Sequence, residues 1–412
     1  MATLPARAHP LGILPLASSL NPPEQVRAAV GAVSRALDER GLAHTMEPSG
    51  GSPPDALLIV TGGTEHHALA ALERVAGPVL LIAHPEQNSL PAALEILGRA
   101  RQLGRNGCIC LLGGGGDGLE RLARLAAYLD VRRRLTSARL GRIGGPSDWL
   151  VASTPGGATV GEVWGPSVVD VPIDEVRDAM ARAGADEAGA IARDFLDGAS
   201  AVGEPSPADV GRAARVAVAL RDVVERHRLD ACAVRCFDLV TDERTTGCLA
   251  LSWLLDHGVV AGCEGDLPAT LTMMWLQAMS GGPSFLANPQ DVDLAANTLS
   301  LAHCTIARRM APVYSLRSHF ESSLGVGIAG AVEPGDATVA RIGGAQLRSL
   351  WVSDARIVAG GDNERRCRTQ VQVRLSSDAA EVLTHPLGNH VVLAPGHWAA
   401  ALREYHGLFV AA

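Results

Sequence analysis

The stretch GCEGDLPATLTMMWLQAMSGGPSFLANPQ, Gly262–Gln290, contains residues that could bind a divalent metal ion. Glu264 and Asp266 stand on a tight glycine-containing turn, and carboxylate oxygens are common ligands of Mg²⁺ and Mn²⁺. Glu264 follows the apolar run VVAGC, which places it at the end of a strand, where open α/β sheets bind their ligands. Asp266 has a simpler interpretation, because Asp before Leu-Pro is an ordinary helix N-cap. The strand-like run SFLAN near the end of this stretch ends in an amide, Asn288.

Three histidines in the same half of the chain are further candidates. His303 lies in the apolar run LSLAHCTI, His319 in SHFES, and His390 follows a Gly-Asn turn in PLGNHVVL. A single histidine in an apolar strand is more often a core residue than a ligand. Together with Glu264 the three favour a metal site, but their spacing cannot show that they meet.

Several reaction classes are excluded by residue types. The chain has no lysine, so all 36 basic residues are arginine. This excludes Schiff-base aldolases, enzymes that anchor pyridoxal phosphate, and P-loop nucleotide hydrolases, because each needs an amine. The sequence contains no HExxH and no GxSxG motif.

The cysteines and the glycine-rich run have mainly structural interpretations. Eight cysteines are scattered without a CxxC pair, which favours reduced thiols in the cytoplasm. Cys248, Cys263 and Cys304 have apolar neighbours typical of packing rather than of nucleophiles. LLGGGGDGLERLARL could bind phosphate at a helix N-terminus, but it lacks the GxGxxG spacing, and a strand-to-helix turn with Asp117 as N-cap is favoured.

Composition indicates a folded protein of more than one domain. At 412 residues, with 47% hydrophobic and 19% charged residues, the chain predicts two or three domains. A formal charge of −8 and a pI near 5.9 argue against nucleic acid as a partner. No apolar run is long enough to span a bilayer, and LGILPLASS is expected to be a first core strand rather than a signal peptide. We therefore expect no membrane association.

The pattern of apolar runs predicts an α/β protein with a β-rich end. Strands alternate with helices in the first half, as in βαβ units, and this first parallel sheet is expected to end around RIGGPSDWLVAS. Helices are predicted at 23–41, 65–76, 88–104, 117–135, 207–227, 246–257 and 267–280. A further strand is predicted at ACAVRCFDLV.

After about residue 284 the pattern changes to strands separated by turns, which is typical of a small barrel or sandwich. The predicted strands are SFLAN, TLSLAHCTI, GVGIAGAV, ATVARIGG, SLWVSDARIVAGG, CRTQVQVRL and NHVVLAPG, before a last helix WAAALREYHGLF. The predicted domains are 1–155, 156–285 and 286–412.

The stretch from TTGCLALSWLLDHGVVAGCEGD to LSLAHC resembles the core of the L-fucose/L-arabinose isomerase superfamily, particularly its shorter fucose-isomerase-like members. HFESSLGVGIAGAV, CRTQVQV and HPLGNHVVL resemble the same proteins, as do AHPEQNSLPAALEILGRAR and GRIGGPSDWL. The resemblance implies two Rossmann-like α/β units followed by a C-terminal β-barrel-like domain. It also implies a Mn²⁺- or Mg²⁺-dependent aldose–ketose isomerase that works through an enediol, in a cytoplasmic homotrimer or homohexamer whose cleft is built partly by a neighbouring subunit.

The resemblance also implies roles for individual residues. The metal is expected on Glu264, His390 and Asn288, and the proton transfer on Glu264, Asp266 and Asn288. The sugar is expected to contact His303, His319 and Asn389. In the arabinose-type members a further histidine ligand falls on His303.

Asn288 stands where the family has an aspartate. An amide keeps one carbonyl oxygen but has no charge and cannot act as a base, so metal affinity should fall. Asp266, Asp291 or Asp293 could replace the missing carboxylate. Three hypotheses follow: an isomerase with an altered metal shell, a different reaction on a sugar-like substrate with or without a metal ion, or a non-catalytic sugar-binding protein.

Overall fold

The computed structural model describes residues 4, 9–47, 52–75, 77–113 and 117–411 of the 412-residue chain. It confirms a mixed α/β protein with parallel sheets and a closed barrel. Contacts divide the chain into a first unit, Leu4–Arg133 with Glu404–Ala412, and a second unit, Arg134–Arg403. The second unit contains both a parallel sheet and the barrel. The predicted division into three domains stays a prediction. The Rossmann-like character of the sheets also stays a prediction.

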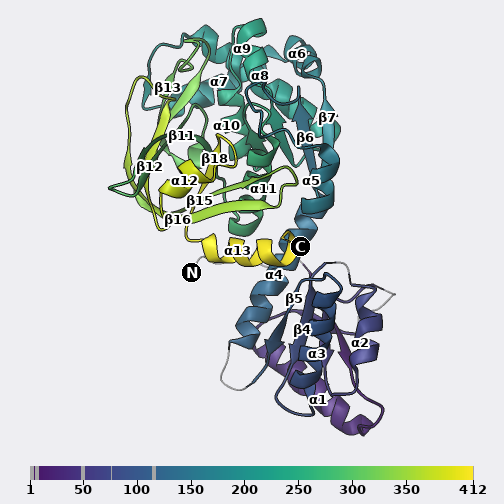
Figure 1. Ribbon diagram of the computed structural model, residues 1–412. Helices are drawn as coiled ribbons and strands as arrows, with labels where there is room; N and C mark the ends of the chain where they lie inside the picture. Colours follow the sequence, from purple (N-terminus) through teal and green to yellow (C-terminus); the bar gives the residue numbers. More distant parts are fainter. Residues whose placement is uncertain (1–3, 5–8, 48–51, 76, 114–116, 412) are drawn as a thin grey trace. The chain divides into compact units, whose positions relative to one another are not determined.

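The first unit is a parallel sheet with the strand order β2-β1-β3-β4-β5. Its strands are β1 (Leu11–Leu16), β2 (His44–Met46), β3 (Ala56–Ile59), β4 (Val79–Ala83) and β5 (Gly107–Leu111). The helices that connect them are α1 (Pro23–Glu39), α2 (Glu65–Leu72), α3 (Ser89–Gln102) and α4 (Gly118–Ser137). These elements agree with the predicted alternation of strands and helices (Figure 1).

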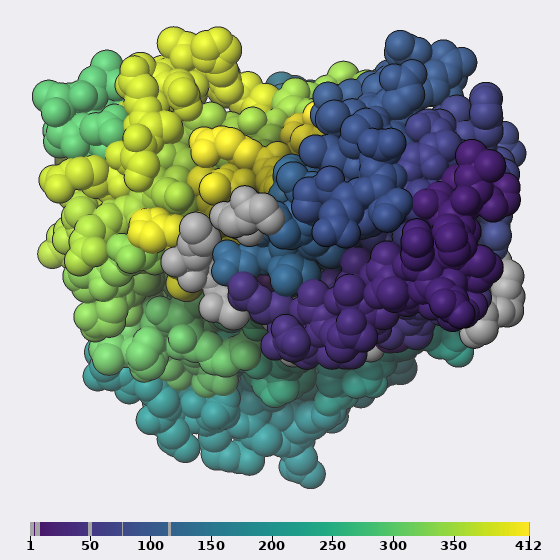
Figure 2. Space-filling model, turned by 90° about the horizontal axis from the view of Figure 1, so that it is seen from below, coloured from purple at the N-terminus to yellow at the C-terminus, as the bar shows by residue number. Residues whose placement is uncertain are grey.

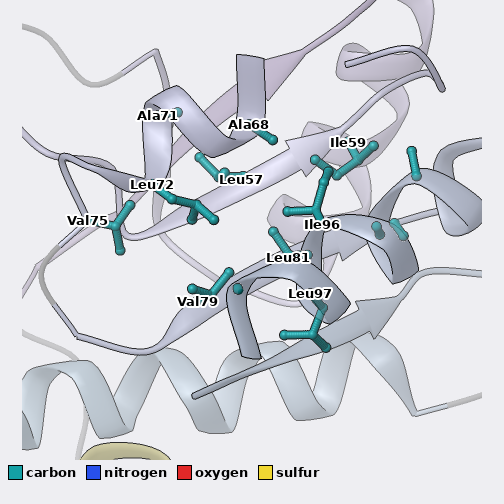
Figure 3. Close-up of a cluster of buried hydrophobic side chains, with 14 residues drawn as sticks. Leu57, Ile59, Ala68, Ala71, Leu72, Val75, Val79, Leu81, Ile96 and Leu97 are labelled. Atoms are coloured by element: carbon teal, nitrogen blue, oxygen red, sulfur yellow. The ribbon is translucent and has the colours of Figure 1, made fainter. Parts of the chain in front are cut away.

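Burial of branched side chains holds this unit together. Leu57, Ile59 and Leu81 on the strands contact Leu72 and Ile96 on the helices, and all are nearly inaccessible to water (Figure 3). Most of α1, in the purple N-terminal part of Figure 2, is exposed or half-buried instead. In the glycine-rich run, residues 114–116 lie outside the described residues, so the structure does not test the phosphate-binding alternative.

The second unit begins with a four-stranded parallel sheet in the order β10-β9-β6-β7. The strands are β6 (Arg139–Ile143), β7 (Ser167–Val171), β9 (Ala231–Val234) and β10 (Val260–Gly262). The prediction that the first sheet extends to RIGGPSDWLVAS is wrong, because β6 pairs with β7 and β9. The predicted strand ACAVRCFDLV is also too long, since its second half forms helix α9 (Phe237–Glu243).

Six helices besides α9 accompany this sheet. They are α5 (Gly157–Trp164), α6 (Ile173–Arg182), α7 (Ala185–Gly198), α8 (Pro207–His227), α10 (Cys248–Asp256) and α11 (Leu267–Ser280). Helix α11 is buried on nearly every side, as expected for a helix without a polar face. It lies against β15 and β18 of the barrel and so links the parallel sheet to the barrel (Figure 1).

The barrel closes in the order β11-β12-β17-β16-β15-β18 with antiparallel neighbours. Its strands are β11 (Phe285–Asp293), β12 (Thr298–His303), β15 (Gly335–Gly343), β16 (Ser349–Gly360), β17 (Thr369–Leu375) and β18 (Val391–Pro395). The predicted strand GVGIAGAV is β14 (Gly327–Ala331), which pairs outside the barrel with β13 (Val313–Arg317), and β13 in turn pairs with β8 (Ala201–Val202). Short helices η1 (Arg308–Met310) and α12 (Ala380–Thr384) and the last helix α13 (Ala399–Phe409) complete the chain.

Candidate metal centre

Glu264 stands on a turn with an unusual backbone conformation directly after β10. Glu264 and Gly265 both have positive φ, 61° and 71°. A Cβ on Gly265 would lie 2.1 Å from the carbonyl oxygen of Gly145, so only glycine fits there. The Ser147 amide donates to the Glu264 carbonyl at 2.9 Å. A non-glycine residue in this conformation costs free energy, and such residues are concentrated at functional sites.

The barrel brings two histidines to this carboxylate. His303 ends β12 and His390 precedes β18, and both strands pair with β11. Glu264 Oε1 lies 3.7 Å from His303 Nε2 and 3.4 Å from His390 Nε2. One ligand atom from each residue lies within 4.8 Å of the other two, and all three residues are buried.

These distances are close to those between ligands of a shared metal ion, and one of them, His390 Nε2 to Glu264 Oε1 at 3.4 Å, lies within the expected range. Two ligands that each lie about 2.1 Å from one ion are about 3.0–3.4 Å apart. Both ring nitrogens of His303 and Nε2 of His390 have no hydrogen-bond partner among the described residues. Buried imidazole nitrogens normally find a partner, so a cation is the missing group that this donor set fits.

The electrostatics of the three residues are strongly coupled. Burial raises the pKa of Glu264, but the imidazoles of His303 and His390 beside its carboxylate outweigh burial and hold that pKa well below its usual range. Burial lowers the pKa of His303, which keeps this imidazole neutral. Burial also acts to lower the pKa of His390, but Asp266 and Glu264 raise it to about 9. Without a cation, the proton on His390 therefore compensates the charge of Glu264.

Asp266 lies behind His390, on the side away from Glu264. Its Oδ2 is 2.9 Å from His390 Nδ1 and accepts a hydrogen bond from Arg341 Nη1 at 2.9 Å. Its Oδ1 caps helix α11 by accepting from the Ala269 amide at 2.8 Å. A carboxylate on Nδ1 fixes the ring so that Nε2 faces the ligand site. Both carboxylate oxygens of Asp266 accept hydrogen bonds, and the residue is fully buried. This position suits a role in orienting His390. The expected role of Asp266 in proton transfer stays a prediction.

Two residues that the sequence did not indicate support the site. Trp149 Nε1 donates to Glu264 Oε2 at 2.6 Å, which leaves Oε1 facing the histidines. Arg341 is 1% exposed and also donates to Ser153 Oγ at 2.6 Å. A Cβ on Gly388 would lie 2.5 Å from Arg341 Nη2, which explains the glycine in the LGNH turn. In the sequence, the arginine inside the apolar strand pattern TVARIGG was the one indication of such a supporting residue, because a buried charge requires a partner.

A cavity opens beside Glu264. The space in it that the centre of a water molecule can reach is about 30 Å³, and its lining includes Glu264, Asn288, His303, His319 and Glu321. The Asn288 carbonyl accepts from Asn389 Nδ2 at 3.2 Å, but Asn389 is exposed and is not part of this lining. The structure therefore brings Asn288 and His319 to the same cavity as Glu264 and His303 and leaves Asn389 outside its lining.

His319 enters the cavity as a neutral side chain. Burial lowers the pKa of His319 to about 4. Its Nδ1 lies 3.0 Å from Ser322 Oγ, and its ring packs edge-on against Phe237 with centroids 5.5 Å apart. A neutral imidazole in this position can donate to or accept from a hydroxyl group.

Comparison with known proteins gives a partial match. A sulfoquinovose isomerase from Alkalicoccus urumqiensis is 27% identical over 238 residues, 54% of this chain and 52% of that protein. A sulfoquinovose isomerase from Clostridium sp. (strain MSTE9) is 32% identical over 94 residues, 23% of this chain and 21% of that protein. One from Priestia aryabhattai is 28% identical over 97 residues, 23% of this chain and 22% of that protein.

The chain thus spans about half the length, or less, of the curated relatives that it matches. No protein-family model matches it. Among the residues that the structure describes, no helix is both long and apolar enough to cross a bilayer.

Proposed function

We propose that the second unit is a metal-dependent aldose–ketose isomerase that acts on a sugar through an enediol. The observation that carries the proposal is the convergence of Glu264 Oε1 with the Nε2 atoms of His303 and His390 beside a cavity. The sulfoquinovose isomerases that match part of the chain support the same reaction class. Isomerase and carbohydrate chemistry are therefore favoured for this chain over the other reaction classes that use a metal ion.

The donor set favours Mn²⁺ over Mg²⁺. Two imidazoles and one carboxylate suit a first-row transition ion, whereas Mg²⁺ prefers oxygen ligands. The metal is proposed to lie on Glu264, His303 and His390, with the Asn288 carbonyl as a further oxygen donor. Such an ion polarises the carbonyl and hydroxyl oxygens of a bound sugar and so makes the neighbouring C–H group more acidic.

The other side chains are proposed to orient these ligands and the sugar. Asp266 fixes the His390 ring through Nδ1, and Trp149 keeps Glu264 Oε1 turned toward the histidines. His319 is neutral at physiological pH and is proposed to bind a sugar hydroxyl group. Asn389 lies outside the described lining of the cavity, so it is proposed to bind a sugar hydroxyl group only if the sugar extends beyond that lining.

The substrate is proposed to be an aldose, with sulfoquinovose, L-fucose and L-arabinose as the first candidates. Sulfoquinovose carries a sulfonate in place of the 6-hydroxyl group of glucose. None of the described residues that line the cavity is an arginine, so a sulfonate requires cationic groups from outside this lining. A second copy of the chain could supply them, and we propose a cytoplasmic homotrimer or homohexamer.

Metal analysis of the purified protein, followed by an isomerase assay with the three sugars, tests the proposal. We expect about one Mn²⁺ per chain and a ketose product that depends on it. A His303→Gln variant should lose the metal, whereas His385→Gln, which changes an exposed histidine of the same unit, should keep it. Absence of Mn²⁺ at neutral pH in the wild-type protein would refute the metal-dependent isomerase.

Asn288 favours two alternatives. With an amide in place of the expected carboxylate, the site could bind a sugar without converting it, or support a different reaction. Saturable sugar binding by the wild-type protein without any ketose product would favour the non-catalytic protein, and a product other than the ketose would favour the different reaction.

A further inference from the structure

A second carboxylate is needed beside the metal candidates if the site isomerises a sugar. Isomerisation moves a proton from C2 to C1, and this step needs a base that is free to accept it. Glu264 is engaged by Trp149 and faces both imidazoles, and Asn288 cannot accept a proton. The base must therefore come from elsewhere in the cavity.

The three aspartates that the sequence offered as replacements are all engaged elsewhere. Asp266 uses both oxygens on Ala269, Arg341 and His390. Asp291 pairs with Arg366 at 3.4 Å, and Asp293 accepts from the Ala296 amide at 2.9 Å. None of these three aspartates lines the cavity.

Glu321 is the other carboxylate in the described lining of this cavity, besides Glu264. It follows β13 on a turn that is closed by the Ser323 amide, which donates to the His319 carbonyl at 2.9 Å. No described residue forms a hydrogen bond or an ion pair with its carboxylate, so both oxygens are available. Partial burial, followed by the charge of Glu264, raises the pKa of Glu321 above its ordinary value.

We propose that Glu321 is the acid–base residue that replaces the carboxylate missing at Asn288. This assignment rests on the proposed isomerase function. The Glu321 carboxylate removes the proton from C2 of the aldose, and the electron pair of that C–H bond forms the C1–C2 double bond of the enediol. Protonated Glu321 then gives the same proton to C1, while the O2 hydroxyl proton passes to O1 and the carbonyl forms at C2. Glu321 ends in its initial state, and no other reactant is consumed.

Glu321→Gln tests the assignment, with Glu333→Gln as the matched control. Glu333 is an exposed glutamate of the same unit that lies outside the cavity lining. We expect E321Q to lower kcat for isomerisation at least about 100-fold, the lower end for loss of a general base, with KM and Mn²⁺ affinity changed less than twofold. E321D should recover part of the rate, and an aldose deuterated at C2 should carry that deuterium to C1 of the ketose when the wild-type protein converts it.

The outcomes separate this assignment from the proposed function. If the wild-type protein isomerises a sugar and E321Q matches it, the assignment to Glu321 is wrong and the isomerase stands. If E321Q loses Mn²⁺ together with activity, Glu321 supports the metal site and is not the base. If the wild-type protein converts none of the sugars, the isomerase proposal fails and the assignment fails with it.

A separate observation concerns the thiols in the same cavity. Cys236 and Cys263 follow the neighbouring strands β9 and β10, and their sulfur atoms lie 2.7 Å apart. A disulfide joins its sulfurs at about 2.05 Å, so a small movement would form the bond. Both thiols are free and nearly buried, but both line the cavity, which gives a small oxidant access to them.

We infer that Cys236 and Cys263 form a site of reversible oxidation by peroxides. Two thiols and one hydrogen peroxide give one disulfide and two water molecules, so the thiols lose two electrons and the peroxide gains them. The modification would lie next to Glu264, whose amide donates to Cys236 Sγ at 3.4 Å.

Peptide mapping under non-reducing conditions after treatment with hydrogen peroxide tests this inference. We expect a linked peptide that contains Cys236 and Cys263 and disappears with dithiothreitol. Cys232→Ala, which removes a buried thiol from β9, should keep the link, and Cys236→Ala should abolish it. A link between Cys304 and Cys367, which line the same cavity, or oxidation without any link would overturn the inference.

Discussion

Replacing Asp266 with alanine tests the buried network behind the site. Asp266 caps α11 through Ala269 and pairs with Arg341, and both charged side chains are almost inaccessible to water. Loss of the cap costs about 1 kcal/mol, and a buried ion left without its partner costs about 3–5 kcal/mol. We therefore expect D266A to lower the free energy of unfolding of the second unit by about 4–6 kcal/mol, a large part of the stability of an ordinary domain.

Tryptophan fluorescence in guanidinium chloride measures this change in the second unit alone. All six tryptophans of the chain lie between Trp149 and Trp398, inside that unit. Asp293→Ala is the matched control, because Asp293 also accepts a backbone amide but is exposed and has no ion pair among the described residues. Its loss should cost about 1 kcal/mol or less.

Asp266→Asn separates orientation of the histidine from stability. Asparagine keeps the oxygen that caps α11 but removes the charge that Arg341 and His390 share. Loss of such a partner of a metal-bound histidine lowers metal affinity about 10–100-fold, which titration calorimetry with Mn²⁺ would measure. A loss of less than about 2 kcal/mol in D266A, or unchanged Mn²⁺ affinity in D266N, would refute the reasoning.

Three further predictions concern single positions. Asn288→Asp should raise Mn²⁺ affinity at least about tenfold, and calorimetry that finds no gain would exclude residue 288 as a ligand. Gly265→Ala should destabilise the second unit by more than about 2 kcal/mol in a denaturant titration, while Gly282→Ala, where a Cβ meets nothing within 4 Å, should be close to neutral. A hydrogen bond from Arg317 lowers the pKa of Glu204 to about 2, so this pair stabilises the fold above pH 4.5 and its contribution is lost as the pH falls toward 2. Because the pair is half-exposed, E204Q should cost less than about 1 kcal/mol at pH 7, and the difference from the wild-type protein should vanish in unfolding curves at low pH.

Elements with local signals were predictable from the sequence. Helix α8 spans Pro207–His227 as predicted, since Ser206 and Asp209 form a capping box at its start. Helix α11 spans Leu267–Ser280, between the Asp266 cap and Gly281 in a left-handed conformation. All seven strands predicted after residue 284 are present, because each is an apolar run bounded by turn residues.

Pairing between distant segments was not predictable in the same way. A strand pattern does not name its neighbour, so the sequence could not assign β6 to the second sheet or exclude β14 from the barrel. Arg341 and Trp149 reach the site from segments far from the Glu264 turn, and no local pattern connects them. The convergence of Glu264, His303 and His390 required the pairing of β11 with both β12 and β18.

The charge of the proposed site explains how Asn288 is compatible with an isomerase. A divalent ion on Glu264 and two neutral imidazoles keeps one net positive charge, which a second carboxylate ligand would cancel. In a buried site that charge would favour a negatively charged enediolate more strongly than the neutral sugar, and this difference would accelerate the reaction. A carboxylate bound to a metal ion is also a weak base. A carboxylate that does not bind the metal accepts a proton more readily, and the metal site keeps its positive charge. Glu321, with free oxygens in the same cavity as Glu264, satisfies this requirement, and the amide at residue 288 then follows from a division of roles rather than from loss of activity.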